Sequence, residues 1–185
     1  MAAKKPVASP LPIPGAFLLE PSEFNDERGS FYKTYDSDTM KAIGMAPLFR
    51  EEYFSVSKQG VLRGFHYQVG EYAQSKLIRC SHGEMYAVIV DLRKSSIAFG
   101  KWEGIALSDK NNLSLYAPRG TATGFLAKSN GATIVLLADN DYAPAFEAGI
   151  IWNDPDLKVK WGIDRPILSE KDLGLPRFSA AKLFD

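Results

Sequence analysis

Short hydrophobic runs, many with polar residues at alternate positions, follow one another along most of this chain. The runs are rich in β-branched and aromatic residues, and each closes on Gly, Pro, Asn or Asp. An alternation of period two places one face of a strand in a core, so the pattern predicts an all-β fold, an antiparallel sandwich or barrel. The runs expected to form strands are Gly60–Tyr67, Lys76–Cys80, Met85–Leu92, Lys101–Leu107, Leu113–Ala117, Ala132–Ala138 and Val159–Ile163.

Helical patterns are few. A segment from Asp36 to Ile43, closed by a glycine, predicts one short helix, and Ser169-Glu170-Lys171-Asp172 has the form of a capped helix start. Residues 1–14 are rich in Ala, Lys and Pro and predict a flexible N-terminal arm. Because no repeat or internal linker follows that arm, we expect residues 15–185 to form a single domain.

Composition narrows the class of partner. Lys and Arg together number 22, as do Asp and Glu, so no global field favours nucleic acid or an anionic membrane surface. No apolar stretch approaches the roughly 18 residues of a membrane-spanning helix. The single cysteine, Cys80, has no intramolecular partner for a disulfide, which suits the reducing cytoplasm. We therefore expect a cytoplasmic protein that binds neither nucleic acid nor a membrane.

The most informative polar residue is His66, which lies in Arg63-Gly64-Phe65-His66-Tyr67-Gln68 with Lys76 ten positions further on. An imidazole titrates near neutral pH, so His66 can take a proton from carbon if a nearby cation stabilises the resulting oxyanion. Arg63 or Lys76 can supply that cation, and the alternative is a structural histidine of a core or turn. The second histidine, His82, precedes a glycine and is interpreted as a solvated turn residue.

Other chemistries lack their usual sequence signals. Two isolated histidines without an H-x-H pattern do not form the ligand set of a catalytic metal. No Gly-rich phosphate loop, no G-x-G-x-x-G motif and no G-x-S-x-G elbow occurs. The sequence thus predicts acid–base chemistry centred on His66, with no metal and no cofactor.

Several longer motifs follow one another from about Phe24 to Asp172. They are Phe24-Asn25-Asp26-Glu27-Arg28-Gly29, Gly60-Val61-Leu62-Arg63-Gly64-Phe65-His66-Tyr67-Gln68, Lys76-Leu77-Ile78-Arg79-Cys80, Val90-Asp91-Leu92-Arg93, Phe99-Gly100-Lys101-Trp102, Gly149-Ile150-Ile151-Trp152-Asn153-Asp154-Pro155 and Leu168-Ser169-Glu170-Lys171-Asp172. In these motifs the chain resembles the dTDP-4-dehydrorhamnose 3,5-epimerases and related nucleotide-sugar epimerases. The resemblance implies a cupin-like jelly roll (a double-stranded β-helix) with a few short helices. It also implies a homodimer in which an N-terminal strand reaches the partner's active site.

The implied activity is that of an isomerase without a cofactor, which epimerises a nucleotide-linked 4-keto-6-deoxy sugar in deoxysugar or polysaccharide biosynthesis. By the same resemblance, His66 removes the proton next to the C4 ketone, Asp172 fixes its tautomer, and Lys76 stabilises the enolate oxygen. Arg63, together with Arg28 from the neighbouring subunit, holds the diphosphate, which suits the guanidinium fork. Tyr142, Glu147 and Lys171 fall on substrate-binding positions of the family, and Tyr142 is also predicted to be catalytic. Tyr53 is the remaining residue predicted to bind the substrate.

The chain departs from the family pattern at several positions of the expected site. Leu136 replaces the tyrosine that reprotonates the opposite face of the sugar, and leucine cannot donate a proton. The family's Ala-His-Gly-Phe motif becomes Ala122-Thr123-Gly124-Phe125, and Ala87 replaces an aspartate, as expected if the lost histidine and aspartate interacted. A Gln-x-Asn element becomes Glu51-Glu52-Tyr53. The pocket is therefore rebuilt where the nucleotide and the far face of the sugar would lie.

Two interpretations stay open. In the first, the protein is an epimerase whose acid is another group: Tyr142, Tyr53, Tyr116 or water. Tyr142 is preferred because it lies in a matched segment leading to Glu147, and such an enzyme would invert a single carbon or act on a GDP-, CDP- or UDP-linked keto sugar. In the second, the scaffold binds a nucleotide sugar without epimerising it. The retained base, its carboxylate and the lysine favour the first, because a carbohydrate-binding protein needs none of them.

Overall fold

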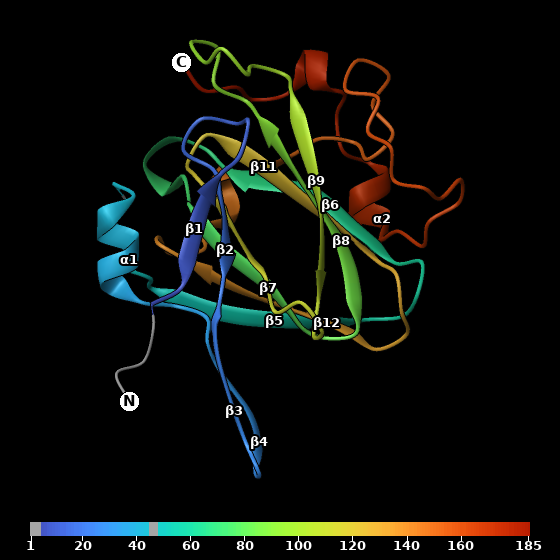
Figure 1. The fold of residues 1–185 in the computed structure, drawn as a ribbon. Helices are drawn as coiled ribbons and strands as arrows, with labels where there is room; N and C mark the ends of the chain where they lie inside the picture. Colours follow the sequence, from blue (N-terminus) through green and yellow to red (C-terminus); the bar gives the residue numbers. More distant parts are fainter. Residues whose placement is uncertain (1–4, 45–47) are drawn as a thin grey trace.

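Two facing sheets of antiparallel strands form the framework of the computed structural model, which describes residues 5–44 and 48–185 (Figure 1). The first sheet has the order β1 (Val7–Pro10), β2 (Phe17–Glu20), β10 (Ser114–Ala117), β7 (Lys76–His82), β12 (Ala132–Ala138) and β5 (Glu51–Ser57). The second has the order β13 (Glu147–Gly149), β6 (Leu62–Gln68), β11 (Thr121–Ala127), β8 (Glu84–Asp91) and β9 (Trp102–Ser108). Apart from the pairs β1–β2 and β8–β9, neighbouring strands in these two sheets are not consecutive in sequence. The predicted all-β jelly roll is confirmed.

The main core lies between the two sheets, where every second residue of a strand points inward. On the first sheet the inward positions include Ile78, Ile134 and Leu136, and on the second they include Ile89 and Leu107. All five are buried, with exposed fractions of 4% or less. The alternation of period two therefore buries the apolar side chains that the sequence pattern selected, and burial of each such side chain contributes about 1.5–3 kcal/mol.

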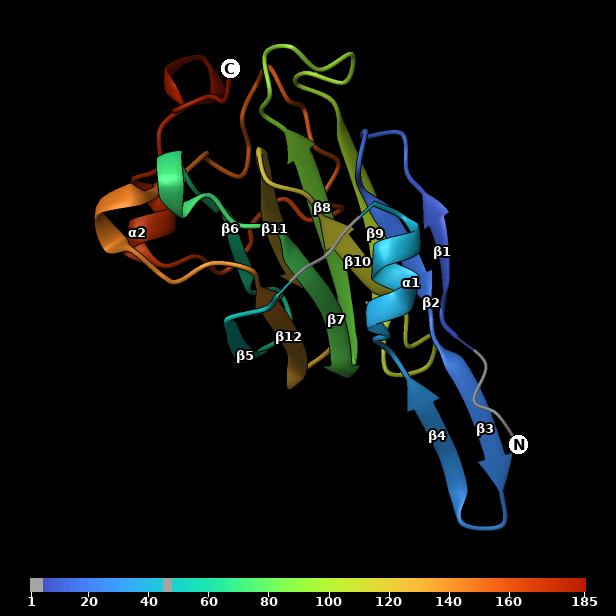
Figure 2. The ribbon, with the colours of Figure 1, turned by 90° about the vertical axis from the view of Figure 1, so that its left-hand side faces the viewer.

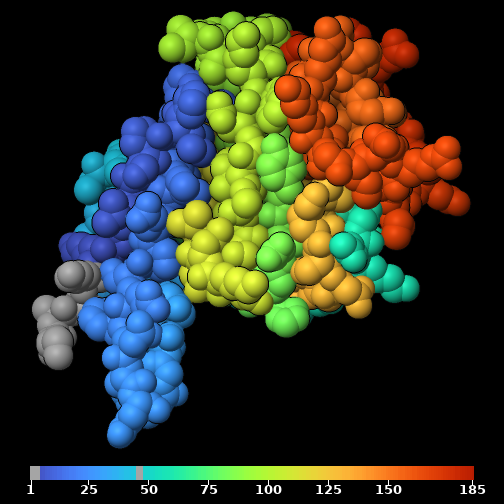
Figure 3. Space-filling model, turned by 45° about the vertical axis from the view of Figure 1, so that its right-hand side comes forward, coloured from blue at the N-terminus to red at the C-terminus, as the bar shows by residue number. Residues whose placement is uncertain are grey.

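A hairpin of β3 (Ser22–Asp26) and β4 (Gly29–Lys33) projects from the body of the molecule (Figures 2 and 3). Its two strands pair with each other and, in the described part of the chain, with no further strand. Phe31, at 60% exposure, lies on this hairpin, and the turn between the strands carries Arg28. A two-stranded ribbon of this kind is marginal alone in water, so a surface that packs against it would stabilise it.

Helices are short, as the sequence predicts. The segment from Asp36 to Ile43 contains α1 (Ser37–Ala42), whose N-cap Asp36 accepts a hydrogen bond from the backbone N–H of Thr39. The capped start at Ser169 is confirmed as α2 (Glu170–Leu173). The described residues also contain three 3-10 turns: η1 (Gly70–Tyr72), η2 (Pro144–Phe146) and η3 (Phe178–Ala180). No helix of the described residues is long and apolar enough to cross a membrane.

Two sequence expectations differ from the structure. The strand predicted at Val159–Ile163 is wrong: positive φ angles at Lys158 (51°) and Gly162 (70°) break the extended backbone, although Trp161 is buried against the second sheet. Within the predicted flexible arm, Val7–Pro10 form β1, an edge strand paired with β2, and residues 1–4 lie outside the described part. The division of the chain at residue 14 stays a prediction.

Candidate active site

A bulge in β6 places Arg63 and His66 on the same wall of a pocket. In a regular strand, residues three apart point to opposite faces, yet both side chains line one cavity. Arg63 pairs with Phe125 and His66 with Thr123, so β6 has one residue more than β11 over this stretch. The bulge includes Gly64, whose φ of 107° suits glycine and whose added Cβ would lie 2.7 Å from the carbonyl oxygen of Thr123.

His66 forms a hydrogen-bonded pair with Asp172. Its Nε2 lies 2.5 Å from Oδ1 of Asp172, and the histidine side chain is 30% exposed whereas that of the aspartate is 5% exposed. The carboxylate comes from α2, where Ser169 caps the helix by accepting from the backbone N–H of Asp172. Burial by itself would raise the pKa of Asp172, but the hydrogen bond and charge of His66 outweigh it and lower that pKa. Asp172 is therefore a carboxylate that orients the imidazole.

Lys76 faces this pair from the first sheet. It begins β7, is 9% exposed and lines the same pocket as His66. Burial lowers the pKa of Lys76 to about 8, and the negative charge of Glu147 offsets part of that effect. At neutral pH the group is thus mostly a poorly hydrated ammonium ion, which suits an oxyanion more than a hydrated surface lysine does.

Glu147, on β13, joins the two other predicted substrate-contacting residues of this region. Its carboxylate accepts from Nζ of Lys171 at 2.6 Å and from the hydroxyl of Tyr142 at 3.0 Å. Burial alone would raise the pKa of Glu147, yet these two donors lower it below its usual value. The phenol proton of Tyr142 is therefore directed to Glu147 in this structure.

The cavity between these walls has a volume of about 890 Å³. Every predicted site residue except Arg28 lines it, and that arginine binds Asp26 on the exposed hairpin turn, with 2.6 Å between Nη2 and Oδ2. The lining residues that the sequence predictions named are Arg63, His66, Lys76, Tyr53, Tyr142, Glu147, Lys171 and Asp172. A cavity of this size is in the range that holds a ligand as large as a nucleotide sugar.

Sequence reasoning missed the residues that hold the loop carrying Tyr142. The side chain of Gln68 donates to the carbonyl oxygens of Tyr72 (2.8 Å) and Asp141 (3.0 Å), and it accepts from the backbone N–H of Ala143 at 2.6 Å. Gln68 closes the His66 motif, so its place in that motif was the available signal. Glu51 adds a further support, because it accepts from the backbone N–H of Tyr142 at 2.8 Å.

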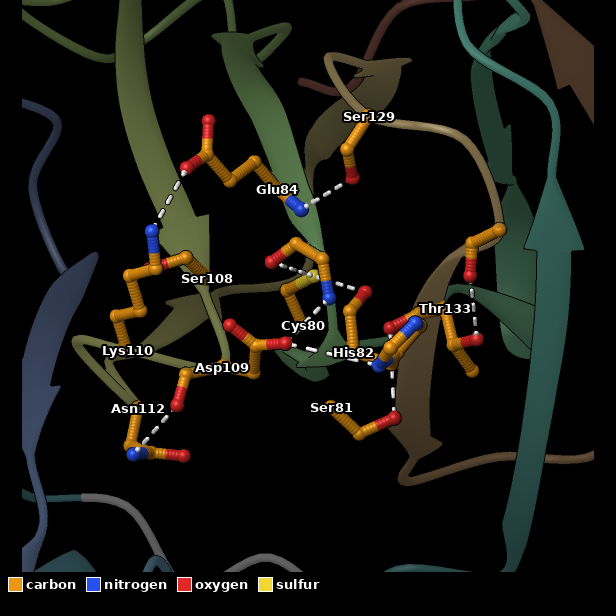
Figure 4. Close-up of polar contacts among 12 residues, drawn as sticks. Cys80, Ser81, His82, Glu84, Ser108, Asp109, Lys110, Asn112, Ser129 and Thr133 are labelled. Atoms are coloured by element: carbon orange, nitrogen blue, oxygen red, sulfur yellow. Dashed lines mark hydrogen bonds and ion pairs between the residues drawn. The ribbon is translucent and has the colours of Figure 1, made fainter.

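The second histidine is remote from this chemistry. His82 ends β7 with a side chain that is 71% exposed, and its Nδ1 lies 3.6 Å from Oδ2 of Asp109. Figure 4 shows this contact. The thiol of Cys80 is directed to the carbonyl oxygens of His82 and Gly83. The predicted exposure of His82 to solvent is confirmed, but the residue is the end of a strand and the turn begins at Gly83. In the described ranges, no three His, Cys, Asp or Glu side chains gather in a way that could hold a metal ion.

The structure also locates the positions at which the chain departs from the expected pattern. Leu136 lines the pocket from β12, and its direct neighbour across the strand pair is Tyr53 on β5. Tyr116 does not line the pocket, and its hydroxyl bonds to Ser75. Of the three tyrosines that sequence analysis named as acids, two therefore reach the cavity.

A jelly roll whose pocket faces a histidine–carboxylate pair with a buried lysine defines a protein built for proton transfer on a bound ligand. A sequence profile of the dTDP-4-dehydrorhamnose 3,5-epimerase family matches residues 10–180, and the chain belongs to this family.

Individual relatives agree with that assignment. The dTDP-4-dehydrorhamnose 3,5-epimerase of Shigella flexneri is 42% identical over 173 residues, 93% of this chain and 96% of the relative. The crystal structure of the enzyme of the same name from Elizabethkingia anophelis superposes with a TM-score of 0.92 at 39% identity, covering 95% of this chain and 98% of the other. A 3'-monoepimerase from Streptomyces bikiniensis, solved with dTDP-quinovose, has a TM-score of 0.87 at 34% identity, with coverages of 92% and 87%.

Proposed function

We propose that this protein is a carbohydrate epimerase, an isomerase that inverts a carbon next to the C4 ketone of a dTDP-linked 4-keto-6-deoxy sugar. The observation that carries the proposal is the pair of His66 and buried Asp172 on one wall of the cavity, opposite the buried ammonium group of Lys76. Membership of the epimerase family and the dTDP-sugar substrates in its relatives' names support the choice of substrate.

His66 acts as the base. Because its Nε2 is bound to the carboxylate of Asp172, Nε2 holds the proton of the neutral ring and Nδ1 is left to accept one. When Nδ1 takes the proton from the carbon next to the ketone, the carboxylate stabilises the imidazolium that forms. A positioned base of this kind contributes roughly 10²–10⁴ in rate.

Lys76 stabilises the enolate. Loss of the proton places negative charge on the ketone oxygen, and the ammonium group of Lys76, which is largely removed from water, supplies a fixed positive charge in the cavity wall. This interaction strengthens as charge develops, so it lowers the barrier more than it improves binding of the ketone.

Arg63 holds the diphosphate of the nucleotide, and its Nε is already oriented by the hydroxyl of Ser57 at 3.1 Å. Arg28 cannot assist within its own chain, because it lies on the projecting hairpin outside the cavity. The proposal therefore includes a homodimer in which the hairpin of one copy reaches the cavity of its partner. The enzyme then works in the cytoplasm, where its single cysteine, Cys80, stays a thiol.

Mixed dimers test the role of Arg28. Arg28→Ala and His66→Asn chains are each expected to be nearly inactive alone, and co-refolding them forms dimers with one complete site. About one quarter of wild-type activity should then return, because half of the dimers are mixed and each has one intact site. No recovery from a mixture that forms dimers would show that Arg28 does not act across the interface.

A single inversion is the alternative that Leu136 favours. With leucine in place of the family's tyrosine, water or a relocated tyrosine must return the proton, and two successive inversions without a positioned acid would be slow. A GDP-, CDP- or UDP-linked keto sugar is the corresponding alternative for the nucleotide.

Solvent deuterium incorporation decides among these outcomes. The protein is incubated in D₂O with dTDP-, GDP-, CDP- and UDP-linked 4-keto-6-deoxy sugars, and the deuterated carbon is identified by NMR. We expect deuterium next to C4 in the dTDP sugar, and a loss of roughly 10²–10⁴ in the exchange rate with His66→Asn. Binding of all four sugars without exchange into any of them would instead identify a nucleotide-sugar-binding protein.

A further inference from the structure

We propose that Tyr53 is the group that returns the proton on the face of the sugar opposite His66, a role that rests on the proposed epimerase function. The observation behind it is the register of β5 and β12, which places Tyr53 directly beside Leu136 on the wall that faces His66. The donor would thus have moved by one strand within the same wall of the pocket.

The strand register fixes which side chains of this wall are neighbours. Leu136 on β12 lies between Tyr53 on β5 and Ile78 on β7, and one row away Ala138 lies between Glu51 and Lys76. Side chains directly opposite each other on antiparallel strands share a face, with Cβ atoms about 4.5–5.5 Å apart. A tyrosine side chain is longer than that separation. The Tyr53 hydroxyl can therefore reach the part of the cavity that lies next to Leu136.

The side chain of Tyr53 faces the cavity. Along β5, the alternate residues Glu51, Tyr53 and Ser55 line the pocket, as does Glu52 near the start of the strand, whereas Phe54 is 68% exposed and does not line it. His66 belongs to β6 in the second sheet. A sugar bound between the sheets would therefore present one face to His66 and the other to Tyr53, the arrangement that inversion needs.

The hydroxyl of Tyr53 is free to donate, whereas those of its competitors are engaged. The Tyr142 hydroxyl donates to Glu147 at 3.0 Å, and Tyr116 bonds to Ser75 outside the cavity. For Tyr53, the described part of the chain provides no hydrogen-bond partner to its hydroxyl, although the residue is only 40% exposed. An unpaired phenol in a partly desolvated site is well suited to bind a developing anion.

Electrostatics keeps this phenol protonated. Desolvation raises the pKa of Tyr53 to about 12, and the carboxylates of Glu51 and Glu147 add to the effect. The group therefore holds its proton throughout the neutral range. It releases the proton only to a strong base such as an enolate carbon, so it acts as an acid in the second half of the reaction.

The proton balance of the step is complete. His66 takes the proton of the carbon next to the ketone, and the electron pair of the C–H bond passes to the enolate oxygen beside Lys76. The enolate carbon then forms a new C–H bond on its other face with the proton of Tyr53. The imidazolium and the phenolate left behind return to their neutral forms by exchange with water, which reaches both partly exposed side chains.

The test separates proton removal from inversion, using Tyr53→Phe in the full-length protein in D₂O. The first measured rate is deuterium exchange into substrate that is recovered with its original configuration, and it depends on His66 alone. The second is the rate of epimer formation, which depends on both His66 and Tyr53. We expect Tyr53→Phe to slow inversion by roughly 10²–10⁴ while exchange with retention persists. Tyr35→Phe removes a phenol that packs on Phe49 outside the cavity and should leave both rates unchanged.

Two outcomes would overturn the role of Tyr53. In one, Tyr53→Phe inverts at the wild-type rate or only raises KM, which would make it a binding residue. In the other, Tyr142→Phe loses inversion but keeps exchange, which would move the donor to Tyr142. A wild-type protein that exchanges no deuterium into any keto sugar would instead refute the epimerase function itself, so the two failures are distinguishable.

Discussion

Replacement of Lys76 by methionine is expected to stabilise the fold and to remove most of the activity. Methionine keeps the length of the side chain and removes its charge, and the position is 9% exposed within the cavity wall. In the native state the ammonium group is separated from most of its water, with a carboxylate of Glu147 as a partial compensation. The charge is therefore retained at a cost in stability that a neutral, apolar side chain does not have.

The size of the effect follows from the lowered pKa of Lys76. The gap between the ordinary value of 10.5 and about 8 in the fold, at about 1.4 kcal/mol for each pH unit, corresponds to about 3 kcal/mol. The unfolded chain binds this proton more tightly than the folded chain does. The buried charge therefore lowers the free energy of unfolding by this full amount below pH 8, and the loss disappears as the pH rises from about 8 to 10.5. At pH 7 the variant should therefore be more stable by about 3 kcal/mol, or about 6–12 °C in Tm.

The effect of Lys76→Met on the free energy of unfolding is measured by urea unfolding at pH 7 and pH 10. Lys58→Met serves as a control for the loss of an exposed lysine. The difference between Lys76→Met and wild type should shrink between these pH values, and Lys58→Met should stay within about 0.5 kcal/mol of wild type at both. Activity of Lys76→Met should fall by roughly 10²–10³ in kcat with a smaller change in KM. A variant that is less stable than wild type at pH 7, or whose only defect is a raised KM, would refute the reasoning.

Two further variants test the other wall. Asp172→Asn should lower kcat by roughly 10²–10⁴ with little change in binding, because an amide no longer fixes the tautomer of His66; a normal rate would detach Asp172 from the pair. Because the pKa of Asp172 is lower in the folded than in the unfolded protein, where it is near 4, its charge stabilises the fold above about pH 4. This stabilisation disappears as the pH falls through the folded pKa, so the difference in stability between wild type and Asp172→Asn should narrow in acid. Gly64→Ala should destabilise the protein by roughly 1–3 kcal/mol, because its Cβ meets the Thr123 carbonyl oxygen; unchanged urea unfolding would contradict a strained bulge.

Individual elements show which parts of the fold the sequence patterns predicted. The runs at Lys76–Cys80 and Ala132–Ala138 were recognised as strands because alternation is a local property that burial on one face imposes. The run at Val159–Ile163 also has apolar residues at alternate positions, yet Trp161 packs on Phe65 and Tyr86 from an irregular segment. Burial of apolar side chains is common to strands and to irregular backbone, so hydrophobicity alone did not separate them.

The candidate site likewise contains residues that the sequence predicted and a neighbour relation that only the fold showed. His66, Lys76 and Asp172 were identified from motifs, because proton transfer needs those residue types whatever surrounds them. The pairing of Tyr53 with Leu136 depends on the register between strands that are about 80 residues apart in sequence, and register is set by side-chain packing across the whole sheet. A substitution at one position and its neighbour on another strand therefore became one structural feature only in the fold.

The sequence by itself determined the strand-rich architecture, the histidine that can take a proton and the loss of one tyrosine. Only the tertiary structure decided that a bulge turns Arg63 and His66 to one side, that the phenol of Tyr142 is bound to Glu147 and that the phenol of Tyr53 is not. The physical reason is the range of the interactions involved. Periodicity and residue chemistry act over a few neighbouring residues, whereas hydrogen bonding and desolvation in a pocket depend on groups that the chain brings together from both sheets.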